Sequence, residues 1–195
     1  MTIETQLFEG KLVQLSPIDH DKDPEVESRW THDLTLMRTL SLHPAMPLSI
    51  AQMKKRYEAI EKEVEESKRL FYFTIRSKQE SKFLGFARIE WIEWTHGTGN
   101  LRMAIGDKDE RNKGYGSDAL ALMLRFAFHE LNLYRLSAIV GEDNPSALRF
   151  FKRYGFVEEV RRRKALLRDG QAWDLIHLGI LREEWLALNS GAQHD

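Results

Sequence analysis

A polar segment of eleven residues, Asp107–Ser117, constrains the fold of this chain more than any other feature. It joins a strand-like segment to a stretch with apolar residues at helical spacing. Gly114 and Gly116 lie where that helix begins, and glycine lets the backbone take positive φ and approach a ligand closely. The unpaired amides of a first helical turn favour an anion, and Arg111 and Lys113 add positive charge. We therefore predict a phosphate-binding loop; an exposed glycine turn is the alternative.

The remaining sequence predicts strands before and after this loop and only a few helices. Ser49, followed three residues later by Gln52, forms a capping box that starts one of the helices. Strand patterns cover residues 10–15, 70–75, 83–94, 100–106, 134–140, 156–166 and 173–180. Helical patterns cover residues 24–40, 50–68, 117–131 and 145–154. This order predicts one α/β (α+β) domain, with a mixed central sheet of about seven strands and flanking helices. Its core spans about 10–181, followed by a short C-terminal tail.

Composition excludes several classes of protein. The chain has 195 residues, with 29 Lys and Arg against 30 Asp and Glu, so no overall charge attracts nucleic acid or an anionic membrane. It has no cysteine, which rules out disulfides, thiolate nucleophiles and cysteine-bound metals. No apolar run approaches the ~18 residues of a membrane span, and the first residues lack a signal peptide pattern. We expect a cytoplasmic protein without a metal site.

Three other motifs compete for the polar loop. Asp107-x-Asp109 begins like a calcium-binding loop, but Arg111 stands at the third ligand position. A nucleotide-triphosphatase loop would need Gly-Lys-Ser or Gly-Lys-Thr, which is missing. Gly114-x-Gly116-x-x-Ala119 matches the dinucleotide fingerprint as a string, yet a polar stretch separates it from the strand. A dinucleotide-binding oxidoreductase is therefore the less favoured alternative.

Two sequence blocks carry a resemblance to a known family. The first is Arg111-x-x-Gly114-x-Gly116, placed between a strand and a helix. The second follows the next strand, beginning at Asn144 and ending at Gly155-Phe156. In this order and spacing, the chain resembles the GNAT superfamily of N-acetyltransferases from about residue 10 to 180.

One branch of that superfamily is especially similar. Asp169-Gly170, followed by Trp173-Asp174, resembles the closing hairpin of enzymes that acetylate the N-termini of ribosomal proteins.

The resemblance implies a cosubstrate, acetyl-coenzyme A, and an amine acceptor. The amine, on a protein N-terminus or a small molecule, would attack the thioester directly, without a covalent enzyme intermediate. It also implies a homodimer as the form of self-association. The cofactor-binding residues implied are Met103, Ala104, Ile105, Arg111, Asn112, Lys113, Gly114, Tyr115, Gly116, Ser117, Asn144 and Phe151. A non-catalytic module that binds acyl-coenzyme A is the alternative.

Glu90 is the predicted catalytic base, because direct attack needs a neutral amine. Strand alternation without a bulge places Arg88, Glu90 and Ile92 on one face and Glu93 on the other. The structural alternative for Glu90 is an exposed strand residue paired with Arg88, and Glu93 is the reserve base.

The expected general acid is missing from the second block. Phe151 stands where many members of the resembling family have a tyrosine, and phenylalanine cannot donate a proton. Water or Ser146 is the alternative acid.

Overall fold

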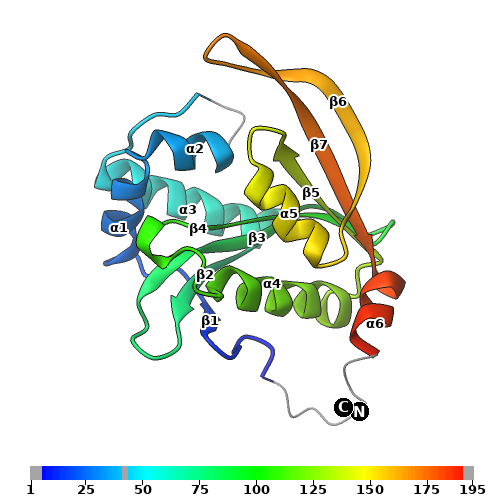
Figure 1. The fold of residues 1–195 in the computed structure, drawn as a ribbon. Helices are drawn as coiled ribbons and strands as arrows, with labels where there is room; N and C mark the ends of the chain where they lie inside the picture. Colours follow the sequence, from blue (N-terminus) through cyan, green and yellow to red (C-terminus); the bar gives the residue numbers. More distant parts are fainter. Residues whose placement is uncertain (1–5, 41–43, 191–195) are drawn as a thin grey trace.

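A seven-stranded mixed sheet forms the centre of the computed structural model, which describes residues 6–40 and 44–190 (Figure 1). The strands follow the order β1-β2-β3-β4-β5-β7-β6, and only β4 and β5 are parallel neighbours among them. The strands are β1 Val13–Ser16, β2 Phe71–Ser77, β3 Phe83–Glu93, β4 Thr98–Ile105, β5 Arg135–Gly141, β6 Val157–Arg168 and β7 Gln171–Leu181. The helices are α1 Asp23–Trp30, α2 Leu34–Leu40, α3 Ile50–Ser67, α4 Tyr115–Arg125, α5 Pro145–Arg153 and α6 Arg182–Ser190. The predicted α/β fold class is confirmed.

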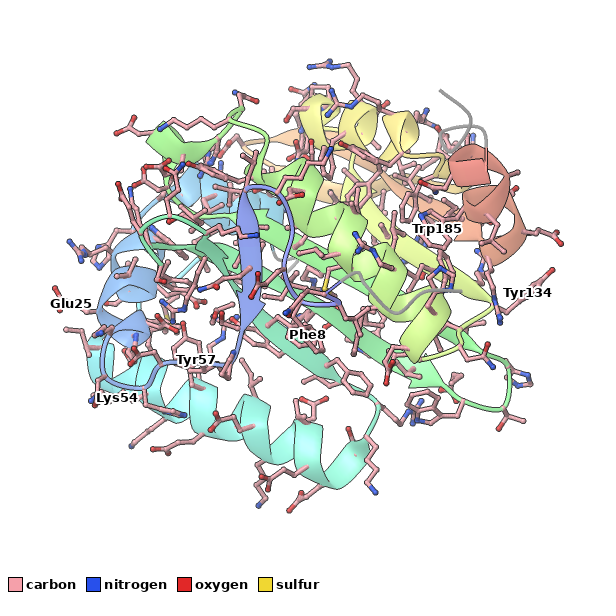
Figure 2. The ribbon with its side chains drawn as sticks, turned by 90° about the horizontal axis from the view of Figure 1, so that it is seen from below. Phe8, Glu25, Lys54, Tyr57, Tyr134 and Trp185 are labelled. Carbon is pink, nitrogen blue, oxygen red and sulfur yellow. The ribbon has the colours of Figure 1, made fainter. Side chains whose placement is uncertain are left out.

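Helices cover both faces of the sheet (Figure 1). The larger hydrophobic core packs α4 and α5 on one face, with buried side chains from the central strands. The smaller core packs Met53, Tyr57 and Ile60 of α3 against Leu70 on the other face. Figure 2 shows Tyr57 between α1 and α3, where it donates a hydrogen bond to Glu27. The predicted capping box of α3 is confirmed, since the Ser49 side chain accepts from the Gln52 amide.

The single helix predicted over residues 24–40 is wrong, because α1 and α2 are separate. The Thr31 hydroxyl donates to the Ser28 carbonyl oxygen at 2.6 Å, where α1 ends. The Asp33 carboxylate then accepts from the amides of Thr35 and Leu36, at 3.0 and 3.2 Å. These contacts stop one helix and start the next, since a side-chain acceptor can satisfy the free amides of a first turn.

A bulge at Trp91 breaks the predicted alternation along β3. Trp91 has a φ of +56°, and the register with β4 shifts between Glu90 and Glu93. A bulge inserts an extra residue and turns the following side chains to the other face. Ile92 consequently joins Ile89 in the larger core, so the prediction that it shares a face with Glu90 is wrong.

The segment predicted as a short C-terminal tail, after residue 181, begins with a helix within the described residues. The chain forms α6, whose Trp185 ring lies 5.4 Å from the Phe128 ring (Figure 2). Phe128 belongs to a π-helical segment, Phe126–Glu130, that continues α4. Sequence periodicity extended one helix over this whole stretch but did not distinguish its π-helical end.

The two central parallel strands part soon after they meet. β4 and β5 pair only from Thr98 with Arg135 to Asn100 with Ser137. Beyond Asn100, β4 pairs with β3 alone, and β5 pairs with β7 alone. The sheet therefore opens at its centre. Across residues 6–40 and 44–190, no helix has both the length and the apolarity required to cross a membrane.

Candidate active site

A cavity of about 800 Å³ occupies the opening between β4 and β5. Its walls come from the parted ends of these strands, from the starts of α4 and α5, from α2, and from the β6–β7 hairpin. Most of the predicted cofactor residues border it, namely Met103, Ala104, Ile105, Arg111, Asn112, Gly114, Gly116, Ser117, Asn144 and Phe151. Residues from two distant sequence blocks thus meet in one space.

Three predicted site residues do not border this cavity. Lys113 forms an ion pair with Glu110 at 3.0 Å. Tyr115 packs against the larger hydrophobic core. Glu90 lies buried behind the cavity wall, beside Arg102.

The start of α4 presents bare backbone to the cavity. Gly114 has a φ of +88°, a conformation that glycine adopts without strain. At Gly116, an added Cβ would be in ordinary van der Waals contact with Ile105 and Phe150, each at 3.9 Å, and Gly116 itself borders the cavity. The amides of a first helical turn have no acceptor within the helix. This geometry fits an anionic group such as a pyrophosphate.

Asp118, in the same helical turn, does not oppose an anion there. Its carboxylate accepts hydrogen bonds from the amides of Lys11, Leu12 and Val13, at 2.7 to 3.1 Å. These contacts hold the start of β1 against α4. They also direct the Asp118 carboxylate toward those amides and away from the cavity.

Two arginines flank the glycine loop and differ in their contacts. Arg111 donates to the carbonyl oxygens of Ile105 and Gly106, at 3.1 and 2.7 Å, so it fixes the loop to the end of β4. Arg153, at the end of α5, donates to the Ser117 hydroxyl at 3.3 Å and borders the cavity. Arg153 was not among the predicted site residues, although it is a cationic residue within the second sequence block.

Glu90 is buried, with 6% of its surface exposed, and its oxygens contact three side chains. Arg88 lies 2.8 Å from Oε2, Arg102 lies 3.2 Å from Oε1, and the Asn100 amide donates to Oε1 at 3.3 Å. The structural alternative for Glu90 was an exposed residue paired with Arg88. The pairing is confirmed, but the predicted exposure of Glu90 is wrong. Burial lowers the pKa of Arg88, and the Glu90 charge opposes this shift.

Comparison with known families decides what this arrangement is. Residues 13–157 match the model of the Acetyltransferase (GNAT) domain family. The chain belongs to this family. The predicted superfamily is thereby confirmed from a match that spans most of the chain.

Relatives of known sequence support the same assignment. YnaD, an uncharacterized N-acetyltransferase of Bacillus subtilis, is 35% identical over 75 residues, which are 38% of this chain and 44% of that protein. YokL, an uncharacterized prophage-derived N-acetyltransferase of Bacillus subtilis, is 28% identical over 77% of this chain and 80% of its own. A putative ribosomal N-acetyltransferase of Bacillus subtilis, YdaF, is 31% identical over 40% of this chain and 43% of its own. The ribosomal branch itself stays a prediction.

A solved structure has the same fold. The spermidine N-acetyltransferase from Vibrio cholerae, in complex with CoA and spermine, superposes with a TM-score of 0.77. The two chains are 18% identical, and the match covers 89% of this chain and 98% of the other.

In this GNAT chain the second block contains no tyrosine acid at the cavity. Phe151 is buried against the rings of Phe150 and Phe156, at centroid distances of 5.4 and 5.1 Å. Ser146 borders the cavity, and its hydroxyl donates to Asn144 Oδ1 at 3.0 Å. The same Asn144 oxygen caps α5 by accepting from the Ala147 amide.

Three residues on the far side of the cavity, Arg38, Asp143 and Arg168, were not among the predicted site residues. Arg38 of α2 forms an ion pair with Asp169, at the tip of the hairpin. Arg168 forms an ion pair with Asp143 at 2.6 Å and also donates to the Arg38 carbonyl oxygen. Within the described part of the chain, the second oxygen of Asp143 is buried without a hydrogen-bond partner.

The described residues also include no group of three or more histidine, aspartate or glutamate side chains arranged to hold a metal ion.

Proposed function

We propose that this chain transfers an acetyl group from acetyl-coenzyme A to a primary amine in a ternary complex. One observation carries the proposal: a single cavity joins the gap between β4 and β5 to the bare backbone at the start of α4. The gap suits an extended chain with peptide-like groups, and the helix start suits a pyrophosphate. Coenzyme A contains both.

The chain's own residues have separate parts in this proposal. The amides of Gly116 and Ser117, together with Arg153, would hold the pyrophosphate. The backbone of residues 103–105 would pair with the pantetheine and polarise the thioester carbonyl. When bound, the cosubstrate supplies the acetyl group as an activated thioester. Arg111 would keep the loop in place through its two carbonyl contacts.

The amine must be neutral to attack, so a proton acceptor matters. At pH 7, deprotonation costs roughly 4.6 kcal/mol for a lysine-like amine and about 1 kcal/mol for an α-amine. Glu90 is the sequence-based candidate, but Arg88, Arg102 and Asn100 already contact its oxygens. Asp143 is also paired, with Arg168 at 2.6 Å, but it borders the cavity and Glu90 does not. This position favours Asp143 as the proton acceptor and Glu90 as the residue that positions Arg102.

The departing thiolate needs no dedicated acid. A thiol with a pKa near 8.5 leaves as the thiolate at pH 7 at a cost of only about 2 kcal/mol. Phe151 in place of a tyrosine is therefore compatible with catalysis, and water or Ser146 can supply the proton.

The test is release of free coenzyme A thiol from acetyl-coenzyme A in the presence of a panel of amines. The panel should contain peptides with free N-termini, amino acids, amino alcohols and polyamines. We expect release that depends on both the protein and one class of amine. Tight coenzyme A binding without release for any amine would contradict transfer and favour the non-catalytic acyl-coenzyme A module.

Self-association is a separate part of the proposal. One structural neighbour, at 19% identity and a TM-score of 0.71, is a dodecameric spermidine N-acetyltransferase from Vibrio cholerae. In this chain, β6 is the outer strand of the sheet, and Val157 and Val160 are about half exposed on it. We expect a homodimer in a cytoplasmic location. Light scattering on the protein at tens of micromolar tests the homodimer, and a monomer mass would contradict it.

A further inference from the structure

The cavity wall is rich in arginine and poor in carboxylates. Among the described residues that border it, Asp143 is the one acidic side chain. The basic residues bordering it are Arg38, Arg102, Arg111, Arg153 and Arg168. Arg111 and Arg153 flank the start of α4, where the pyrophosphate would bind, so their positive charge would be neutralised by that group. The other three arginines lie outside that loop and need a separate account.

Two of these three are already balanced by carboxylates. Arg38 contacts Asp169 through two hydrogen bonds, at 2.6 and 2.9 Å. Arg168 contacts Asp143 at 2.6 Å. This group of four side chains has two positive and two negative charges. It adds no net charge to the far side of the cavity.

Arg102 differs because it shares its carboxylate. Glu90 is the one carboxylate paired with both Arg88 and Arg102 among the described residues, which leaves one positive charge in excess. Arg88 is the more buried of the two, since 16% of its side chain is exposed against 32% for Arg102. Arg88 is also the closer to Glu90, at 2.8 Å against 3.2 Å. Arg102, which borders the cavity, is therefore the guanidinium available to a ligand.

Resting on the proposed function, we infer that the acceptor is a small primary amine that also carries a carboxylate or phosphate group, which Arg102 binds. A guanidinium presents two parallel N–H donors that match either group. Asp143, the one acidic side chain among the described residues that border the cavity, suits the amine end of the same molecule. A polycation such as spermidine would instead bring further positive charge to an arginine-rich wall, which is unfavourable.

The experiment compares amines in matched pairs that differ in the anionic group. The pairs are glycine with glycinamide and phosphoethanolamine with ethanolamine, with spermidine and a neutral peptide alongside. Each is measured for thiol release and, by calorimetry, for binding to the protein saturated with coenzyme A. The two pairs also distinguish a carboxylate from a phosphate. For each amine, the rate or affinity of the wild type is divided by that of Arg102→Gln. This ratio removes the effect of the amine's own pKa.

We expect Arg102→Gln to weaken binding of the anionic amines about ten- to hundredfold, which is the range of a lost charged hydrogen bond. Binding of their neutral partners should weaken less than about twofold. Arg102→Lys, which keeps the charge without the paired donors, should lie between these values. Arg162→Gln is the matched control, because Arg162 lies on β6 and does not border this cavity. Melting temperature and coenzyme A affinity check that each variant is folded.

Preference for spermidine or the neutral peptide, or an equal loss for both members of each pair, would overturn the inference. Selective binding of anionic amines without thiol release would support it and contradict the proposed transfer. Thiol release without any preference for anionic amines would support the proposed transfer and contradict this inference.

Discussion

Arg38 of α2 and Asp169 of the β6–β7 hairpin form an ion pair through two hydrogen bonds, although 131 positions separate them. Each raises the charged fraction of the other: Arg38 lowers the pKa of Asp169, and Asp169 raises the pKa of Arg38. The Asp169 side chain is mostly exposed, so the pair adds little to overall stability. Its main effect is to join two walls of the cavity.

Asp169→Asn should loosen these walls without unfolding the protein. We expect KM for the amine to rise several-fold, while coenzyme A affinity and melting temperature stay unchanged. Because the Asp169 pKa is lowered, the pair should persist above the usual range of aspartate and be lost as pH falls below it. Steady-state kinetics would measure this. The control is Asp21→Asn, an exposed aspartate that does not border the cavity.

Gly116→Val should reduce coenzyme A affinity at least about tenfold while the protein stays folded, because Gly116 borders the cavity and an added Cβ makes only ordinary van der Waals contact with Ile105 and Phe150. Calorimetry gives the affinity. Unchanged affinity would remove the glycine loop from the coenzyme A site.

Gly114→Ala should destabilise the fold by about 1 kcal/mol, because φ at this position is +88°. It should also weaken coenzyme A binding, because Gly114 borders the cavity. Gly170→Ala is the matched control. Gly170 also has positive φ, at +75°, with open space around it, and it does not border the cavity. We expect a similar change in melting temperature there, with normal coenzyme A affinity.

Asp143→Asn should lower kcat/KM for the preferred amine by about 10²- to 10⁴-fold at neutral pH, as is typical for loss of a general base. The loss should shrink as pH rises, since solvent then supplies the neutral amine. Glu90→Gln should give a loss that does not depend on pH, because Glu90 would act by holding Arg102. The measurement is kcat/KM against pH for both variants. The opposite pattern would return the base to Glu90.

Glu27→Gln should change how stability depends on pH. Burial raises the folded-state pKa of Glu27 above its ordinary value of 4.5. Its favourable contribution is therefore complete below that value and is lost as pH rises through the folded-state pKa. Urea unfolding should show the wild type losing stability relative to Glu27→Gln as pH rises. The control is Glu25→Gln, on the outer side of the same helix (Figure 2). Parallel curves for all three proteins would contradict the prediction.

Local chemistry explains what the sequence could predict. The glycine loop, the capping box of α3 and the second block each consist of residues close together in the sequence, so their patterns are visible along the chain. The break between α1 and α2 also depends on Leu48, whose amide donates to the Thr31 hydroxyl and whose carbonyl accepts from Ser28. That contact crosses 17 residues and leaves no periodic signal.

The amine side of the cavity was the least predictable part. Alternation assigned Glu90 to a face, but the bulge at Trp91 and the approach of Arg102 from the next strand determine its burial and its partners. Arg38, Asp143 and Arg168 meet only when the hairpin folds against α2. Such contacts depend on tertiary packing and have no spacing rule.

The parting of β4 and β5 also reverses the usual pattern of backbone protection in a sheet. Amide hydrogens in central strands normally exchange with solvent most slowly, and those at the outer edges exchange fastest. Here the cavity lies at the centre of the sheet, where residues 101–105 lack a partner on the β5 side. Hydrogen exchange should therefore be fast at alternate residues of this central strand in the free protein. A bound ligand that pairs with them would make the same amides among the slowest.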